Sequence, residues 1–229
     1  MYNHINNKKM KKIIISIIAI CCLFVACTKE VQNVSKVVTV VYPSITLNGS
    51  AIVSTGVGTG AYVDPGATGY DILTGSTKTL TPILNNVDLT TPGFYSVEYS
   101  DTNADGFYAS VIRLVLVTGV SSATDLSGTY ARQSNGQTVT VTKQGTGLYT
   151  TDNVGGVANN LAFIFPVYFG QISDTTIAVP VQPCGVGGTV YCDNGSGGPC
   201  TLDTLAPITF AWVVHNGSFG TSLRVFVHQ

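Results

Sequence analysis

Few residues of this 229-residue chain have the types and spacing that chemistry requires. Three cysteines, Cys184, Cys192 and Cys200, lie eight residues apart in a stretch rich in Gly, Asn and Pro. Zinc sites favour cysteines two to four residues apart with histidine nearby, so we expect no metal here. In an exported protein a disulfide is the natural state, and we expect one among the three. Cys184–Cys192 would staple a hairpin across Gly187-Gly188, whereas Cys192–Cys200 would close the loop that ends at Pro199; the sequence leaves both open.

The sequence offers little support for catalytic residues. The only histidines after residue 27 are His215 and His228, and both stand at the ends of C-terminal strands, where histidine is mostly solvated. The chain has no Gly-x-Ser-x-Gly motif, in which a sharp turn would expose a nucleophilic serine. We therefore expect no enzyme, no catalytic residue and no cofactor.

Aromatic side chains are the next candidates, because exposed rings often bind glycans. Trp212 shares its strand parity with Phe210, while Ala211 and Val213 point the other way, so both faces are apolar and Trp212 is predicted to lie in the core. Tyr168 and Phe169 follow a proline in an expected loop. These two residues are the predicted ligand-contact aromatics.

A short acidic stretch, Asp101 to Gly106, matches the first half of a calcium-binding loop. The ligands would be Asp101, Asn103 and Asp105, but the twelfth position, where a bidentate glutamate belongs, is Ile112. Asp, Asn and Gly also suit a hairpin turn, because they tolerate left-handed backbone. The turn is the favoured interpretation and calcium the weaker one.

The element that decides where these residues act lies at the N-terminus. Four lysines between residues 8 and 12 precede an apolar run, Ile13 to Ala26, of 14 residues. As a helix it would reach about 21 Å, too short for a hydrocarbon core of about 30 Å. Residues 1–26 are therefore predicted to be a signal peptide. Val25-Ala26-Cys27 resembles the lipobox of bacterial lipoproteins, which implies palmitate and other acyl chains on Cys27.

Lipidation at Cys27 would leave a mature protein anchored to the membrane, with residues 27–39 as a tether. Three acyl chains hold permanently where one chain holds only marginally. Thr28 follows the cysteine, and the absence of Asp at that position favours the outer membrane in the enterobacterial sorting rule. We expect an outer-membrane lipoprotein, with its periplasmic or cell-surface face left open.

Composition restricts both fold and partners. Residues 1–26 contain four of the eleven Lys and Arg residues and no Asp or Glu, so their removal changes the formal net charge from −1 to −5. An acidic chain without a Lys/Arg cluster argues against nucleic acid as a partner. Charged residues make up 10% of the chain, against about 25% in a typical soluble domain. Val, Thr and Tyr suit strands, and no stretch has a sustained helical period, so we predict an all-β protein of two domains.

The first domain is predicted at residues 40–120 and resembles a known family. Its motifs ITLNG, YVDPGA, TPGFYSVEY and DG, which begin at residues 45, 62, 91 and 105, resemble those of the pesticidal-crystal-protein type of Ig-like domain. That domain recurs on bacterial surface proteins, and the resemblance implies a seven-stranded β-sandwich that acts as a spacer or display module. Residues 68–79 depart from the family because the customary Asp-Gly-Asp segment is missing.

The second domain is predicted at residues 121–229, where short strands alternate with turns in the manner of an antiparallel β-sandwich or barrel. LSGTY at residues 126–130 and GLYT at residues 147–150 resemble the C-terminal domain of a group of Bacteroidota lipoproteins without an established activity. We expect a non-enzymatic envelope lipoprotein in which this domain binds a glycan or another ligand and the Ig-like domain is a spacer. The alternative is a structural or protein-interaction module of an outer-membrane complex with no small ligand.

Overall fold

The computed structural model describes residues 40–158 and 160–229. The predicted signal peptide, the lipidated Cys27 and the tether at 27–39 lie outside these residues. Within them the regular structure consists of sixteen β-strands and one short 3-10 helix, Leu161–Phe163. No helix in the described ranges has the length and apolarity to cross a membrane.

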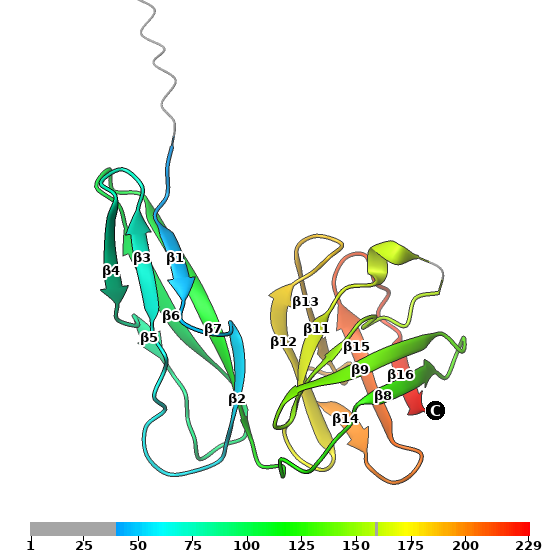
Figure 1. Cartoon of the computed structure of the whole chain (residues 1–229). Helices are drawn as coiled ribbons and strands as arrows, with labels where there is room; N and C mark the ends of the chain where they lie inside the picture. The colour runs from blue at the N-terminus through cyan, green and yellow to red at the C-terminus, as the bar shows by residue number, and fades with distance from the viewer. Residues whose placement is uncertain (1–39, 159) are drawn as a thin grey trace, which may run out of the picture. The chain divides into compact units, whose positions relative to one another are not determined.

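The first seven strands form two sheets, drawn from blue to green in Figure 1. One sheet has the order β1-β3-β4 and the other the order β2-β7-β6-β5, with β2 parallel to β7 and the remaining pairs antiparallel. This arrangement confirms the predicted Ig-like sandwich. The strands are β1 (Ser44–Leu47), β2 (Ile52–Gly56), β3 (Ala67–Asp71), β4 (Ser76–Leu80), β5 (Leu84–Asn85), β6 (Gly93–Thr102) and β7 (Tyr108–Thr118).

Strand periodicity explains the core of this sandwich. Successive side chains of a strand point to opposite faces, so Val97 and Tyr99 of β6 face the same way and are both buried. They pack with Ala67, Leu80 and Val115 into one apolar cluster. The β3–β4 hairpin occupies the stretch that departs from the family pattern, so the missing Asp-Gly-Asp segment does not remove a strand.

The C-terminal strands close into an antiparallel barrel of eight positions, which resolves the predicted choice between sandwich and barrel. Around the ring the order is β8-β9-β10-β11-β12, then β13 and β14 in a shared position, then β15 and β16, which pairs with β8 again. The strands are β8 (Gly128–Arg132), β9 (Thr138–Gly145), β10 (Leu148–Thr151), β11 (Val167–Gln171), β12 (Thr176–Pro183), β13 (Thr189–Asp193), β14 (Cys200–Asp203), β15 (Thr209–His215) and β16 (Leu223–His228).

Aromatic side chains fill the barrel. Trp212 is fully buried, as predicted, and its indole N–H donates a hydrogen bond of 2.8 Å to the Val154 carbonyl. Its neighbours in the core include the rings of Phe169, Phe210 and Phe226. The placement of Phe169 corrects the predicted exposed aromatic pair, because this residue lies in β11 with none of its surface exposed.

Each fold has its own apolar core. The clustered side chains of the sandwich come from residues 45–115, and those of the barrel come from residues 126–226.

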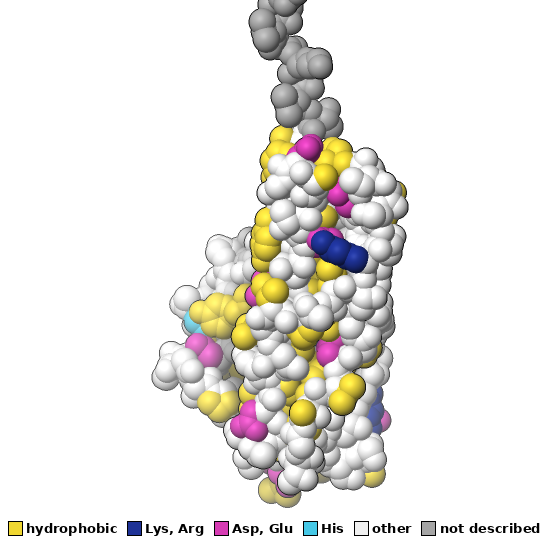
Figure 2. Space-filling view, turned by 90° about the vertical axis from the view of Figure 1, so that its left-hand side faces the viewer, with side chains coloured by type: hydrophobic (Ala, Val, Ile, Leu, Met, Phe, Trp, Pro, Cys, Tyr) yellow, Lys and Arg dark blue, Asp and Glu magenta, His cyan; other side chains and the backbone are white. Residues whose placement is uncertain are grey.

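Charged side chains are few and scattered on the face drawn in Figure 2, where uncharged groups predominate. The low charge content of the sequence is therefore visible as a largely neutral surface.

Candidate functional site

Two neighbouring strands of the barrel, β13 and β15, bring an aromatic ring, an imidazole and a carboxylate together. In the antiparallel register Tyr191 lies directly opposite His215, and Asp193 lies one diagonal step away, opposite Val213. The Tyr191 and His215 rings stack with centroids 4.5 Å apart and planes 7° from parallel. Cross-strand neighbours on one face of a sheet touch in this way, so the register itself creates the cluster.

Asp193 is the third member of the cluster. The Asp193 Oδ1 atom lies 2.9 Å from His215 Nε2, and that nitrogen makes no well-aligned hydrogen bond in the described chain. The imidazole lowers the pKa of the Asp193 carboxyl below its ordinary value, and the backbone N–H of Gly195, 2.6 Å away, acts in the same direction. The carboxylate is therefore ionised at neutral pH and lies within ion-pair distance of the imidazole.

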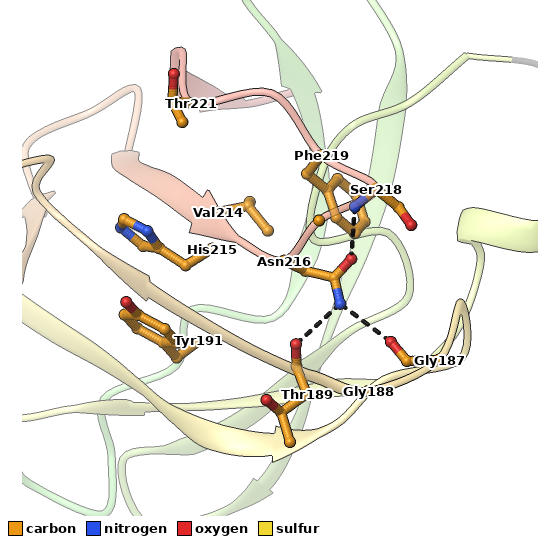
Figure 3. Close-up of a pocket in the computed structure, with 11 residues that line it drawn as sticks. Gly187, Gly188, Thr189, Tyr191, Val214, His215, Asn216, Ser218, Phe219 and Thr221 are labelled. Carbon is orange, nitrogen blue, oxygen red and sulfur yellow. Dashed lines mark hydrogen bonds between the residues drawn. The ribbon is translucent and has the colours of Figure 1, made fainter.

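An open hollow of about 710 Å³ lies beside this cluster. Its walls come from the β12–β13 turn and from the β15–β16 loop, and Figure 3 shows Tyr191 and His215 side by side along it. Asn216 ties the two walls together, because its Nδ2 donates to the carbonyls of Gly187 (3.1 Å) and Thr189 (2.9 Å). Its Oδ1 also accepts from the Ser218 backbone N–H at 2.9 Å. These bonds, drawn as dashed lines in Figure 3, hold the β15–β16 loop against the β12–β13 turn.

The β15–β16 loop is supported from beneath. Phe219 is buried and meets Phe163 edge to face with ring centroids 4.9 Å apart. The buried Arg224 lies over the same ring at 5.8 Å, and its guanidinium donates to the carbonyls of Gly220 and Ser222. A loop anchored by packing and by charge-assisted hydrogen bonds presents its outer side chains in a fixed geometry.

The predicted ligand-contact residues lie outside this hollow. Tyr168 is half-buried in β11, and its backbone N–H and carbonyl each form a 2.8 Å hydrogen bond with the Gln182 side chain. Phe169 faces the core, as described above. Of the two predicted surface histidines, His215 lines the hollow, whereas His228 packs edge to face against Tyr130.

The three cysteines are free thiols in this structure, and the predicted disulfide stays a prediction. Cys192 and Cys200 are buried in the barrel core, and Cys184 is partly buried against it. No cluster of three or more His, Cys, Asp or Glu side chains in the described part of the chain is placed to hold a metal ion.

The predicted calcium loop has the geometry of a hairpin turn between β6 and β7. Asn103 Oδ1 accepts from the backbone N–H groups of Asp105 (3.1 Å) and Phe107 (2.8 Å), as the side chain of a turn residue does. The buried Asp101 carboxylate contacts the Lys78 ammonium at 2.6 Å and accepts from the Thr102 N–H. The side-chain oxygens Asn103 Oδ1 and Asp101 Oδ1 are thus engaged within the protein.

Sequence reasoning missed Tyr191 and Asn216. Strand parity could have found the tyrosine, because Val190 and Cys192 are buried and an alternating strand must then direct Thr189 and Tyr191 outward. Nothing comparable identified Asn216, since its role depends on a turn that is distant in sequence.

The hollow presents an aromatic face beside neutral polar side chains. A half-exposed tyrosine ring stacked on an imidazole offers a flat apolar face, and Asn, Ser and Thr side chains around it offer hydrogen bonds. An Asp–His pair is also part of a hydrolytic triad, which needs a nucleophilic hydroxyl bonded to the imidazole. Among the described residues no such hydroxyl bonds to His215.

Comparisons with known proteins give the first fold a family. Residues 45–117 match the model of the Ig-like domain of bacterial surface proteins, so the chain carries a domain of this type. A crystal structure of the lipoprotein BT2262 from Bacteroides thetaiotaomicron is 21% identical to the chain. The match covers 82% of this chain and 100% of that one with a TM-score of 0.38, and a likeness at this level says nothing about ligands. No curated protein matches the sequence.

Proposed function

We propose that this protein is a lipid-anchored binding protein of the outer membrane, and that its C-terminal barrel binds a glycan in the hollow beside Tyr191 and His215. The observation that carries the proposal is the flat, half-exposed tyrosine ring at the rim of a hollow lined by neutral polar side chains. The Ig-like domain is the spacer between the membrane and this site.

A glycan fits the site because sugar rings present two kinds of surface. Their axial C–H groups form an apolar face that packs on an aromatic ring, and their hydroxyls both donate and accept hydrogen bonds. Tyr191 is 39% exposed, so one ring face remains available although the other covers His215. Thr189, Ser218 and Thr221 lie around it with hydroxyls of matching capacity.

The dimensions and charge of the hollow also favour a neutral saccharide. A volume of about 710 Å³ lies within the range of about 300–1,000 Å³ that small-ligand sites occupy. No Lys, Arg, Asp or Glu is among the described residues that line it, and the Asp193 carboxylate lies 2.9 Å from the Nε2 atom of the lining His215. A strongly anionic or cationic ligand would therefore find no fixed counter-charge in the lining.

Envelope attachment rests on the N-terminal sequence together with the domain family. Cys27 follows a lipobox-like Val25-Ala26 pair, and the Ig-like domain belongs to a type found on bacterial surface proteins. Replacement of Cys27 by Ala should abolish metabolic labelling with palmitate and release the protein from the membrane fraction. Continued labelling of that variant would overturn the lipid anchor.

A glycan array tests the binding proposal. The detergent-solubilised protein is compared with Tyr191→Ala, which removes the ring face, and with Tyr108→Ala, a matched control in which a tyrosine of similar exposure is removed from the Ig-like domain. Binding of the wild type and the control to at least one neutral glycan, with loss in Tyr191→Ala, supports the proposal. Absence of binding to any glycan, with co-purification of an outer-membrane protein, would instead support the protein-interaction alternative.

A further inference from the structure

The strands β13 and β14 share one position in the barrel, and a six-residue excursion separates them. Both strands lie between β12 and β15 and run antiparallel to each of them. The excursion, Asn194 to Pro199, leaves the sheet after Asp193 and returns at Cys200. In the sheet, therefore, Cys200 occupies the place that residue 194 would take in an uninterrupted strand.

The register on the two flanking strands places the cysteines two steps apart. On β12, Cys192 lies opposite Val179 and Cys200 opposite Ile177. On β15, Cys192 lies opposite Val214, and the pairing of Thr201 with Ala211 places Cys200 one step further along, opposite Trp212. The pairings with β12 and with β15 thus both place Cys192 and Cys200 two residue positions apart along the sheet.

Residues two steps apart in a strand point to the same face, and both of these thiols face the barrel core. At about 3.3 Å of rise per residue their Cα atoms are about 6.6 Å apart. Disulfides join residues whose Cα atoms are about 4.4–6.8 Å apart and whose Cβ atoms are about 3.5–4.5 Å apart. The Cα separation lies at the upper end of its range, and the two parallel side chains must approach by about 2 Å for the sulfurs to bond. The chain between them contains Gly195, Gly197 and Gly198, which allow the neck of the excursion to close further.

We propose that Cys192 and Cys200 form a disulfide that closes the excursion at its neck, and that Cys184 remains a free thiol.

Geometry excludes the competing pairs. The Cys184 backbone N–H donates to the Gly188 carbonyl at 3.0 Å, and Pro183 lies opposite Thr189, so Cys184 stands across the hairpin from residue 188. Cys192 is four residues further along β13, or about 13 Å away. This separation exceeds the limit of about 7 Å beyond which two cysteines cannot be bridged without moving the backbone. Cys200 lies further still.

The reaction is a thiol–disulfide exchange with an external disulfide such as that of a glutathione or an oxidoreductase. One cysteine thiolate attacks this disulfide and forms a mixed disulfide, and the second cysteine then attacks the protein-side sulfur. The protein loses two thiol hydrogens and gains one S–S bond, while the external disulfide gains both hydrogens and two electrons and leaves as two thiols. No other oxidant is needed.

Burial decides when this exchange occurs and how long its product lasts. Burial raises the pKa of the Cys192 thiol well above its ordinary value and that of the Cys200 thiol to about 12, so neither is an effective nucleophile once the barrel has closed. Oxidation therefore belongs to folding, before the core is sealed. The finished bond is shielded from reductants by the same burial.

The disulfide would also fix one element of the proposed glycan site without depending on it. Asp193, the partner of His215, is adjacent to Cys192 at the neck of the excursion. A closed neck restricts where this carboxylate can move relative to the imidazole. The disulfide is nevertheless a claim about connectivity, and its test does not require a ligand.

Peptide mapping tests the connectivity directly. The full chain, refolded with reduced and oxidised glutathione, is alkylated in denaturant without reductant and cleaved before aspartate and after tyrosine. Cleavage after Tyr191 and before Asp193 puts Cys184, Cys192 and Cys200 on three different fragments. The expected result is one linked pair of fragments, carrying Cys192 and Cys200, together with an alkylated Cys184. Alkylation of all three cysteines, or any link that includes Cys184, would overturn the proposal.

Thermal unfolding provides a second test, and reduced wild type can be measured if a variant is produced in low yield. The double variant C192S/C200S, or reduction before heating, should lower the midpoint of barrel unfolding by about 5–10 °C, as expected for loss of a crosslink around nine residues. The matched control C184S should retain the midpoint of the oxidised wild type. Equal midpoints for oxidised and reduced wild type would contradict the crosslink.

Discussion

The two folds of this chain each contain a carboxylate paired with a basic side chain, and the pairs differ in what surrounds them. In the Ig-like domain Asp64 contacts Arg113, whose side chain is fully buried. In the barrel Asp193 contacts His215, whose side chain is 30% exposed. The first pair is enclosed by its own protein, whereas the second borders a hollow.

Enclosure leaves the buried pair with little capacity for a ligand. The Arg113 guanidinium donates to the carbonyls of Ser50 (3.0 Å) and Asn48 (2.8 Å) as well as to Asp64. The Tyr99 hydroxyl donates to the same carboxylate. These bonds tie the β1–β2 turn and the Asp64-Pro65-Gly66 turn to β6 and β7, so the network is structural.

The Asp193–His215 pair of the barrel differs in what surrounds it. Tyr191 covers one face of the imidazole while its own ring is 39% exposed, and among the described residues the hydroxyls of Thr189, Ser218 and Thr221 form no hydrogen bond. A charged pair therefore signals function here only when apolar and polar surface beside it remains free. Each of the following predictions perturbs one side of this comparison.

The largest effect is expected for Arg113→Met. This change leaves the Asp64 carboxylate in the sandwich without its cation, and breaking a buried pair typically costs about 3–5 kcal/mol. Urea unfolding of the sandwich should show a correspondingly lower midpoint. The control Lys78→Met removes a cation whose own side chain is 60% exposed, although its partner Asp101 is buried, and it should cost clearly less than Arg113→Met. Equal costs for the two variants would contradict the structural role of Arg113.

Removal of the Tyr99 hydroxyl should have a smaller effect that depends on pH. Burial and the hydrogen bond to Asp64 raise the pKa of Tyr99 from about 10 to about 12. Because the folded state holds this proton more tightly, the stabilisation is complete below pH 10 and is lost as the pH rises towards 12. Tyr99→Phe should cost about 1.5–3 kcal/mol at neutral pH, as expected for a hydrogen bond to a charged group, and the cost should shrink over that interval. A cost that does not vary with pH would contradict this network.

Acid should act on the sandwich through Asp64. Burial alone would raise the pKa of this carboxyl, but hydrogen bonds from Tyr99 and Arg113 outweigh it and lower the pKa below 3.8. The stabilisation is therefore present above pH 3.8 and is lost as the pH falls through the folded-state value. The difference in stability between wild type and Asp64→Asn should be constant from pH 5 to 7 and decrease below 3.8. A difference that grows on acidification would reverse the assigned sign.

The smallest change in stability is expected at the barrel pair. His215→Gln removes a partly exposed imidazole, and pairs near the surface contribute about 0–1 kcal/mol. The same variant should bind the array glycan at least ten-fold more weakly, because the support beneath Tyr191 is altered. Calorimetric titration measures the binding and urea unfolding measures the stability. A large loss of stability with unchanged affinity would make the pair structural, like that of the sandwich.

The sequence predicted the all-β class, the Ig-like sandwich and the buried Trp212, because strand composition and local motifs determine these features. The sequence did not distinguish a closed barrel from a sandwich in the second domain. The last contact of the barrel, between β11 and β12, has only two residue pairs, and the Gln182 side chain bridges to Tyr168 where the ladder stops. No local sequence pattern predicts so short a pairing between β11 and β12.

The sequence did not locate the hollow. Its pattern predicts that His215 is a solvated histidine at a strand end, and it favours Tyr168 and Phe169 as ligand contacts because they follow a proline that is typical of a loop. In the structure the strand begins directly after that proline, so Phe169 turns inward and takes part in the core. Tyr191 became a site residue only through its register with His215, which depends on strands 24 residues apart along the chain.

Nuclear magnetic resonance of the protein with neutral oligosaccharides tests the central claim most directly. A saccharide that binds in the hollow should shift the ring signals of Tyr191 and His215 and the side-chain amide signal of Asn216. The variant Tyr191→Ala should abolish this binding. Signals of the buried Arg113 network should not move. Shifts confined to the Ig-like domain, or saturation of binding with the Tyr191 and His215 signals unchanged, would contradict the account.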